Sequence, residues 1–386
     1  MTLSKLTRNY IIIITSLLLI GVLYWFFIWR FYKYTDDAYV EGNQIIITPL
    51  VPSFVQAIHT DDTFLVKKGQ LIIELDDSDA KIAFNRAEEN LANTIREVCG
   101  MFHQVFAYKA EIEIKKALFI KAKQDFDHRE HVVQEGGVSV ENFEHATAAL
   151  RESIFALQMT EILYYKSVAM VQGTSVRNHP LVQIASDKFL DAWLGLYRCK
   201  IYSPVEGLAA QRTIQVGKWV NPGDFLMSVI PLDQIWVNAN YKETQLKKMR
   251  IGQPVKVTSD LYGRSVVFHG TILGLPGGAG NAFSLLPPQN LSGNWIKIVQ
   301  RLPVRVGLSQ EALKRHPLRI GLSMETTVDV HDEDGEIVPE TTAGSPTYET
   351  PIYKLEEIGS KAAIEKIFEQ NFDPRLDAFK TNPLKE

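Results

Sequence analysis

Two stretches of the chain, "LVKKGQLIIELDD" (Leu65–Asp77) and "VNPGDFLMSVIPLD" (Val220–Asp233), share one short pattern. Each contains a valine, two further residues, a glycine, a polar residue and then an apolar run. The two glycines, Gly69 and Gly223, are 223 − 69 = 154 positions apart. Short apolar runs bounded by turn residues are typical of β-strands. The repetition therefore predicts two related β elements that are far apart in the chain.

The residues that precede these stretches match at the same offset. "PLVPSFVQ" begins at Pro49 and "SPVEGLAA" at Ser203, and 203 − 49 = 154. We expect the two segments to be halves of one lipoyl-like β-sandwich, related by approximate two-fold symmetry. Gly69 and Gly223 should occupy equivalent turns, and glycine at both indicates a positive φ that is costly for other residues.

Between the two halves the pattern becomes helical. No proline occurs from Ala80 to Gln134, and apolar residues recur there every seventh position, at Leu91, Val98, Val105, Ile112, Phe119 and Phe126. The same spacing returns beyond a glycine-containing turn, at Phe143, Leu150, Leu157, Tyr164 and Val171. Heptad spacing is typical of coiled coils, whereas ordinary core helices drift to a period of 3.6. This favours a protruding antiparallel hairpin over a packed helical domain.

The ends of the hairpin are predicted by capping and breaking residues. Asp76 to Asp79 supply caps for a helix that starts near Ala80, and Ser139 caps the second helix. Pro180 interrupts that second helix. Because the hairpin is inserted between two halves of one domain, the strand ends at Leu75 and Ile201 should be neighbours in space.

A membrane-spanning helix is predicted near the N-terminus. Tyr10 to Trp29 is a run of 20 uncharged residues, which at 1.5 Å per residue covers about 30 Å, the thickness of a bilayer core. A cleaved signal peptide would be shorter and would end in small residues, so this alternative is disfavoured. Basic residues flank the run equally, so they leave its orientation open.

The composition excludes some classes of function. The chain of 386 residues is 46% hydrophobic and 22% charged, which predicts two or three globular domains. The net charge of −4 gives no basic face for nucleic acid. From Ile235 onward, short strands punctuated by Gly, Pro and Asn predict a small antiparallel β-barrel.

The whole chain is therefore expected to be mainly β with a long α-helical coiled-coil hairpin. The predicted parts are a cytoplasmic stub and transmembrane helix (1–34), the first barrel strand and first half of the lipoyl-like domain (35–76), the hairpin (77–200), the second half of that domain (201–231), the barrel (232–330), and an acidic linker and C-terminal tail (331–386) with one short amphipathic helix.

No catalytic, cofactor-binding or metal-binding residues are predicted. The glycine-rich "GLPGGAGNAF" (Gly274 to Phe283) lacks the Lys and Ser/Thr of a phosphate loop. His128, His131 and His145 near the hairpin turn are best explained as solvated side chains. The hairpin insertion replaces the turn that carries the modified lysine in a true lipoyl carrier. Cys99 and Cys199 should be free thiols, because helical rise separates them by about 30 Å.

With these features in this order, the chain resembles HlyD-family periplasmic adaptor (membrane fusion) proteins. "IWVNANYKETQLKKMRIGQPV" and "AFSLLPPQNLSGNWIKIVQRLPVRV" are similar to the EmrA branch in particular. The resemblance implies an inner-membrane anchor with the body in the periplasm of a Gram-negative bacterium. It implies a major-facilitator drug transporter and a TolC-like outer-membrane channel as partners, a homo-oligomer, and export of drugs across both membranes.

The resemblance also implies a docking site at the hairpin tip. Many adaptors carry there an arginine, a leucine four residues later and a serine seven residues beyond that. Counting back from Ser139 gives Val132 and His128, with Arg129 adjacent to the position of the family's arginine. We therefore expect His128, Arg129, Val132 and Ser139 to contact the channel.

Two other functions remain as alternatives. The same architecture serves ABC-type (type I) secretion systems, which the EmrA-like blocks disfavour. A lipoyl-bearing enzyme subunit is disfavoured because Lys81, the nearest lysine, lies in the predicted helix.

Overall fold

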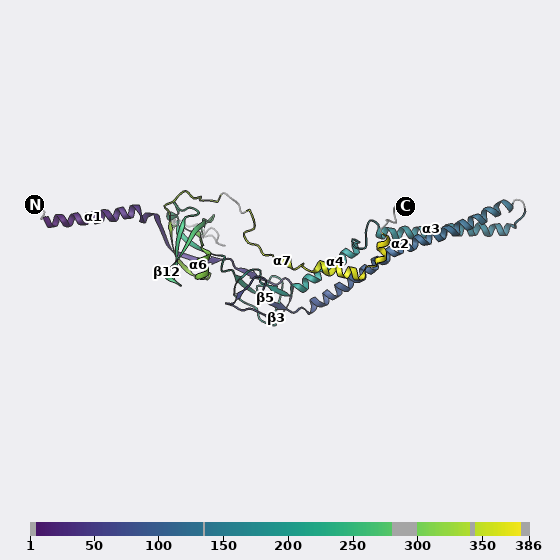
Figure 1. Ribbon diagram of the computed structural model, residues 1–386, viewed down its shortest axis with the longest axis horizontal. Helices are drawn as coiled ribbons and strands as arrows, with labels where there is room; N and C mark the ends of the chain where they lie inside the picture. The colour runs from purple at the N-terminus through teal and green to yellow at the C-terminus, as the bar shows by residue number, and fades with distance from the viewer. Residues whose placement is uncertain (1–4, 134–135, 280–298, 340–343, 380–386) are drawn as a thin grey trace, which may run out of the picture.

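The computed structural model of the chain describes residues 5–133, 136–279, 299–339 and 344–379. The molecule is elongated (Figure 1). The apolar helix α1 (Lys5–Phe27) lies at one end, followed by a β-barrel, a β-sandwich and a helical hairpin at the other end. The predicted fold class is confirmed.

The barrel is closed by a strand that comes from the start of the chain. Its order is β1-β10-β13-β12-β11-β14, so β1 lies between β10 and β14. The strands are β1 (Tyr32–Gly42), β10 (Ile235–Lys242), β11 (Pro254–Ser259), β12 (Gly263–Gly274), β13 (Arg301–Leu308) and β14 (Ser323–Asp329). Two short helices, α5 (Glu243–Leu246) and α6 (Gln310–Arg315), interrupt the strands. Most of the second EmrA-like block falls in residues 280–298, outside the described residues.

Every second side chain along a barrel strand points into the barrel and fills its interior. In β10, Val237, Ala239 and Tyr241 are fully buried, whereas the residues between them are half-buried. A buried Tyr241 hydroxyl requires a partner, and its oxygen lies 2.8 Å from the Thr326 hydroxyl oxygen. Burial raises the pKa of Tyr241 strongly, so the phenol stays neutral.

The sandwich consists of two four-stranded sheets, β2-β9-β7-β4 and β6-β5-β3-β8. Each sheet takes strands from both halves of the chain. The strands are β2 (Ile45–Ile47), β3 (Ser53–Ile58), β4 (Leu65–Val66), β5 (Leu71–Leu75), β6 (Lys200–Tyr202), β7 (Gly207–Ala210), β8 (Trp219–Val220) and β9 (Met227–Ile230). Adding 154 to the residue numbers of β2 and β4 leads to β6 and β8, and subtracting 154 from those of β9 and β7 leads to β5 and β3. The first sheet is thus converted into the second with the strand order kept.

Hydrogen bonds repeat with the same offset. The Gly69 amide donates to the Ser203 carbonyl at 2.8 Å, and the Gly223 amide donates to the Pro49 carbonyl at 3.1 Å. Both glycines have a positive φ, 78° and 88°. Each half therefore closes its turn on the other half, and the halves are related by an approximate two-fold axis.

A second pair of hydrogen bonds with the same 154-residue offset identifies Thr63 as a strained position. The Thr63 amide donates to the Ala209 carbonyl, and the Gly217 amide donates to the Val55 carbonyl, at 2.9 and 2.8 Å. Thr63 has φ 75° and Gly217 has φ 85°. A β-branched residue in the left-handed region is strained, and glycine removes this strain.

Thr63→Gly should stabilise the sandwich by about 0.5–1 kcal/mol, because relief of left-handed strain exceeds the entropy that glycine adds to the unfolded chain. The reverse change, Gly217→Thr, should destabilise it, although no atom would clash with a Cβ there. Hydrogen exchange of the sandwich amides in the full-length protein measures both. Equal protection in the two variants would contradict the strain at Thr63.

The hairpin is built from α2 (Ser78–Val133) and α3 (Val140–Val171), and α4 (Pro180–Tyr197) continues it towards the sandwich. The Asp76 carboxylate accepts from the Ser78 amide at 3.1 Å at the start of α2. Pro180 occupies the first turn of α4, after the predicted break. The predicted helices and their interruption are therefore observed.

The heptad positions face the interior, but burial decreases towards the tip. Fully or almost fully buried α2 residues are Leu91, Ile95, Val98, Val105 and Ile112. Beyond Ile112 the aromatic seam residues are half-buried, as at Phe126 and Phe143, whose ring centroids are 5.3 Å apart, while the small Ala146 is buried. Cys99 and Cys199 are buried free thiols, as predicted. The base of the hairpin is therefore more strongly packed than the tip.

Ile112→Asp should destabilise the outer hairpin by at least about 3 kcal/mol, because it places an unpaired charge at a site that is 8% exposed. Ile114→Asp is the matched control, because Ile114 is 61% exposed on the same helix. Loss of hydrogen-exchange protection in α3 in the first variant only is expected. Similar protection in both would contradict the coiled-coil seam.

The C-terminal segment returns to the base of the hairpin. It contains α7 (Ile352–Leu355), α8 (Ser360–Asn371) and the 3₁₀ helix η3 (Pro374–Phe379). The yellow α8 lies along α4 and α2 in Figure 1, and Ile367 and Phe368 join the same hydrophobic cluster as Phe189. Leu355 and Ile358, which precede α8, are exposed.

The described start of the expected acidic linker is not free of the barrel. Glu333 forms an ion pair with Lys248 on the barrel, and the Ile251 amide donates to the Glu336 carbonyl at 2.9 Å. The acidic composition of the linker alone indicated a solvated segment. Lys248, the basic residue that pairs with Glu333, comes from a distant part of the sequence.

Candidate functional site

The hairpin tip is closed by two glycines. The Gly136 amide donates to the Val133 carbonyl at 3.2 Å, and the Gly137 amide donates to the Val132 carbonyl at 3.1 Å. Gly136 has φ 76°, in the left-handed region that glycine favours. A Cβ on Gly137 would lie 2.6 Å from a methyl carbon of Val132. The turn therefore requires small residues, independently of any partner.

Two of the four predicted tip residues also hold the tip together. Arg129 forms an ion pair with Asp125 at 3.0 Å and donates to the Asn142 carbonyl on the other arm at 3.3 Å. The Ser139 hydroxyl accepts from the Asn142 amide at 3.3 Å and so caps α3. A substitution at Arg129 or Ser139 would therefore disturb the turn as well as any docking surface.

The other tip residues are free to meet a partner. His128 is exposed, and Val132 is 38% exposed. Sequence reasoning missed Val140, which is 66% exposed in the first turn of α3. The available indication was that Val140 is apolar and directly follows the capping serine Ser139. Val132 and Val140 give the tip two exposed aliphatic side chains.

The tip histidines belong to no cluster of potential metal ligands among the described residues. In the described part of the chain, no group of three or more His, Cys, Asp or Glu side chains could hold a metal ion. His145 lies 3.8 Å from Glu141, one turn earlier on the same helix. The described tip therefore offers surface contacts rather than coordination chemistry.

Ionic contacts fix the C-terminal segment to the hairpin base. The Arg177 guanidinium binds both Glu365 carboxylate oxygens and lies over the Phe368 ring, 4.2 Å from its centroid. The buried Glu356 pairs with Arg198 at 2.9 Å, and its carbonyl accepts from the Trp193 indole at 3.0 Å. The Arg177 contacts join α8 to the break between α3 and α4, and the Glu356 contacts join the end of α7 to the last turns of α4.

A third ionic contact reaches further up α2. The Asp373 carboxylate accepts from Arg375 at 2.8 Å and lies 2.8 Å from His103 Nε2. Arg375 and then His103 hold the pKa of Asp373 well below its ordinary value. A lowered carboxyl pKa stabilises the fold at pH values above the unfolded pKa of about 3.8, and this stabilisation is lost as the carboxylate is protonated in acid. The Asp373 carboxylate is therefore fully charged near neutral pH.

Phe368→Ala should release α8 from the hairpin base, because Phe368 is 7% exposed and its truncation costs about 3 kcal/mol. Trypsin cleavage after Lys361 and Lys366 should accelerate in this variant. Ile358→Ala is the matched control, because Ile358 is 67% exposed. Unchanged cleavage after Phe368→Ala would mean that α8 is held by its ion pairs alone.

A cavity of about 460 Å³ lies where the C-terminal segment crosses the sandwich. Four tyrosines contribute to its lining, Tyr197, Tyr202, Tyr348 and Tyr353. The Arg198–Glu356 pair also lines it. The cavity therefore combines aromatic walls with one neutralised ion pair.

The backbone conformation explains why glycine occupies the turns at Gly69 and Gly223. No heavy atom lies within 4 Å of a Cβ placed on either glycine, so neither is required by close packing. Their positive φ and their reciprocal hydrogen bonds explain the choice of glycine.

Comparisons with known proteins agree with this architecture. Residues 78–199 match the family model described as EmrA, alpha-helical hairpin domain. The probable multidrug resistance protein EmrK of Escherichia coli (strain K12) is 41% identical over 340 residues, 87% of this chain and 88% of that protein. The multidrug export protein EmrA of Haemophilus influenzae is 39% identical over 363 residues, 93% of each chain.

A solved structure of the periplasmic adaptor protein EmrA covers 78% of this chain and 99% of its own, at 15% identity. The TM-score of the two structures is 0.39. The sequence relatives, by contrast, match at high identity along most of their length. They confirm the resemblance carried by the two sequence blocks, and the chain belongs to the EmrA family.

Proposed function

We propose that this chain is the periplasmic adaptor of a tripartite multidrug efflux pump. In this role it links an inner-membrane major-facilitator transporter to a TolC-like outer-membrane channel. The observation that carries the proposal is the order of parts along one elongated molecule, with an apolar helix at one end and a protruding hairpin at the other (Figure 1). Relatives with this chain's sequence pattern are named for multidrug export and resistance.

The apolar end is suited to anchoring. The candidate span Tyr10–Phe31 has 22 residues, about 33 Å of helix, and none of it is buried against the rest of the protein. Tyr24, Trp25 and Trp29 are exposed near its end, where aromatic residues favour the membrane interface. We propose that α1 crosses the inner membrane once and that the body lies in the periplasm.

The hairpin end is suited to reaching a distant partner. Helix α2 has 56 residues, and at 1.5 Å per residue it extends about 84 Å. Rigid helices hold contact residues more reproducibly than loops do. We propose that His128, Val132 and Val140 form the docking surface for the channel, with Arg129 and Ser139 keeping the turn in shape.

The lipoyl-type sandwich is proposed to be structural rather than catalytic. Lys81 lies in the first turns of α2 rather than in a turn between the two halves of the sandwich. Its ammonium pairs with the Asp77 carboxylate at 2.9 Å. The inserted hairpin occupies the place where a carrier domain presents its lysine. We therefore propose an adaptor without enzymatic activity and without a cofactor.

Val140→Glu should abolish drug resistance while expression and membrane insertion are retained. The charge would stand at the centre of the proposed docking surface, where a repulsive contact costs several kcal/mol, or about 100-fold or more in affinity for the channel. Val140 is exposed, so the change costs the fold little. A resistance assay and co-purification of the outer-membrane channel measure the effect, with Val140→Thr as the uncharged control.

Full resistance with Val140→Glu would place channel docking elsewhere on the adaptor. Identification of the co-purifying inner-membrane protein tests the other partner. An ABC transporter in that complex would favour the type I secretion alternative and would contradict the major-facilitator assignment.

A further inference from the structure

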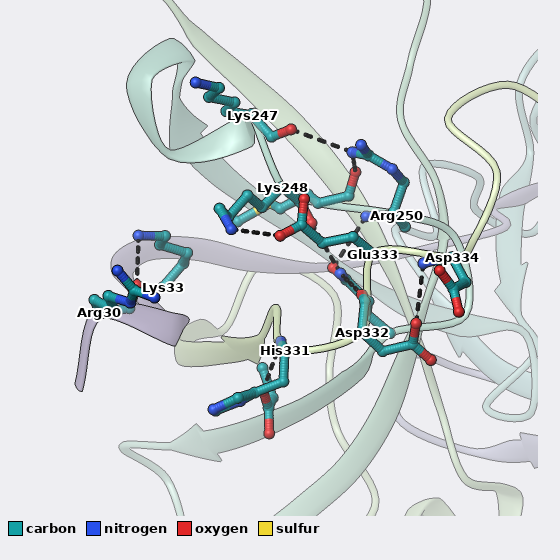
Figure 2. A network of polar contacts seen from close by, with 12 residues as sticks. Arg30, Lys33, Lys247, Lys248, Arg250, His331, Asp332, Glu333 and Asp334 are labelled. Atoms are coloured by element: carbon teal, nitrogen blue, oxygen red, sulfur yellow. Dashed lines mark hydrogen bonds and ion pairs between the residues drawn. The ribbon is translucent and has the colours of Figure 1, made fainter. Parts of the chain in front are cut away.

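Basic side chains gather where the apolar helix meets the barrel. Arg30 and Lys33 follow α1, and Lys247, Lys248 and Arg250 follow the short helix α5 (Figure 2). We call these five residues the membrane-proximal basic patch. The two groups are more than 200 residues apart in the sequence, and the barrel brings them together.

Phe31 connects the patch to the end of the span. It is the last residue of the candidate span. The Arg30 guanidinium carbon lies 4.7 Å from the centroid of the Phe31 ring, and the Lys248 ammonium lies 5.5 Å from it. The headgroup layer is about 5–7 Å thick on each side of the hydrocarbon core. The Lys248 ammonium therefore lies no further from the last residue of the span than the thickness of one headgroup layer.

Most of the positive charge in the patch is not neutralised. Among the described residues, Arg30, Lys33, Lys247 and Arg250 form no ion pair with a carboxylate. The Lys33 ammonium donates to the Arg30 carbonyl at 2.9 Å, and Arg250 donates to the carbonyls of Lys247 and Met249. Each of these contacts leaves a full positive charge on the side chain and retains capacity for an anionic ligand.

One carboxylate competes for the patch. Glu333 pairs with Lys248, whereas the Asp332 carboxylate accepts from the Asp334 amide and, among the described residues, forms no ion pair with the patch (Figure 2). Lys248 lowers the pKa of Glu333 by its hydrogen bond, and the nearby charges of Lys248, Arg250 and Lys247 add to the effect. Glu333 therefore occupies the position that a phosphate would take beside Lys248.

Two features of the patch point to a phosphate group presented by a membrane. Basic residues beside a membrane helix attract anionic lipids, and lysine and arginine bind phosphate by charge-assisted hydrogen bonds. A patch that only increased solubility would have no reason to converge on the last residue of the span. The aromatic Phe31 ring under Arg30 and Lys248 provides an apolar floor, as expected at an interface.

We propose that the membrane-proximal basic patch binds the phosphate of anionic phospholipids in the membrane that α1 crosses. Binding holds the base of the barrel against the membrane surface. The lipid phosphate replaces the Glu333 carboxylate as the ionic partner of Lys248. This inference rests on the proposed membrane anchoring of α1. It does not depend on the identity of the transporter or of the channel.

The test uses the full-length protein in detergent with added phosphatidylglycerol or phosphatidylcholine, and native mass spectrometry counts the bound lipids. Each basic side chain near an anionic surface changes binding about five-fold, so Lys247→Gln with Lys248→Gln should weaken phosphatidylglycerol binding roughly 25-fold. Lys121→Gln with Lys123→Gln is the matched control, because it removes the same charge from exposed positions on α2. The control should bind as the wild type does.

Two further arms sharpen the test. Glu333→Gln should strengthen phosphatidylglycerol binding several-fold, because it removes the competing carboxylate. Inorganic phosphate should not displace the lipid at equal concentration, since it lacks acyl chains. Displacement by phosphate would identify a free-anion site and overturn the lipid proposal.

Equal binding of the two lipids, or equal loss in the patch and control variants, would also overturn it. Retention of the wild-type protein in washed membranes is measured separately and tests the anchor. A retained protein without lipid preference would refute the patch and leave the proposed anchor intact.

Discussion

The pairing of β5 with β6 is the contact on which the shape of the molecule depends. Ile73 pairs with Ile201, and the Leu75 amide donates to the Cys199 carbonyl at 2.8 Å. The chain leaves the sandwich after β5 and must return to it at β6, so everything inserted between them starts and ends at nearly one place. After the 56-residue helix α2, the chain can return to β6 only through a second segment that runs antiparallel to α2. The hairpin therefore follows from completing the sandwich.

The stability of the helical part is graded from base to tip. At the base, α2 packs against α4 and α8, and Phe189 and Phe368 share one hydrophobic cluster. Towards the tip only two helices remain, the aromatic seam residues are half-buried, and local contacts such as the Ser139 cap hold the turn. This gradient gives a rigid base that sets direction and a tip whose exposed side chains are available for contact.

The two ends of the molecule differ in chemistry in a way that suits two different surroundings. The end near α1 combines an exposed apolar helix with Arg30, which lies beside Phe31 and forms no ion pair among the described residues. The tip carries exposed aliphatic groups, Val132 and Val140. The net charge of −4 for the whole chain hides this contrast, because charge and apolar surface act locally.

The sequence by itself determined the elements that depend on local or periodic patterns. The uncharged run from Tyr10, the heptads, the Ser139 cap, the Pro180 break and the 154-residue offset each constrain the backbone through neighbours in the chain or through an exact repeat. Only the tertiary structure decided the contacts between distant segments. The position of Lys248 beside Phe31 and the docking of Phe368 on the hairpin base depend on the barrel and hairpin being complete. Such contacts leave no periodic trace, because a single side chain from each segment is enough to make them.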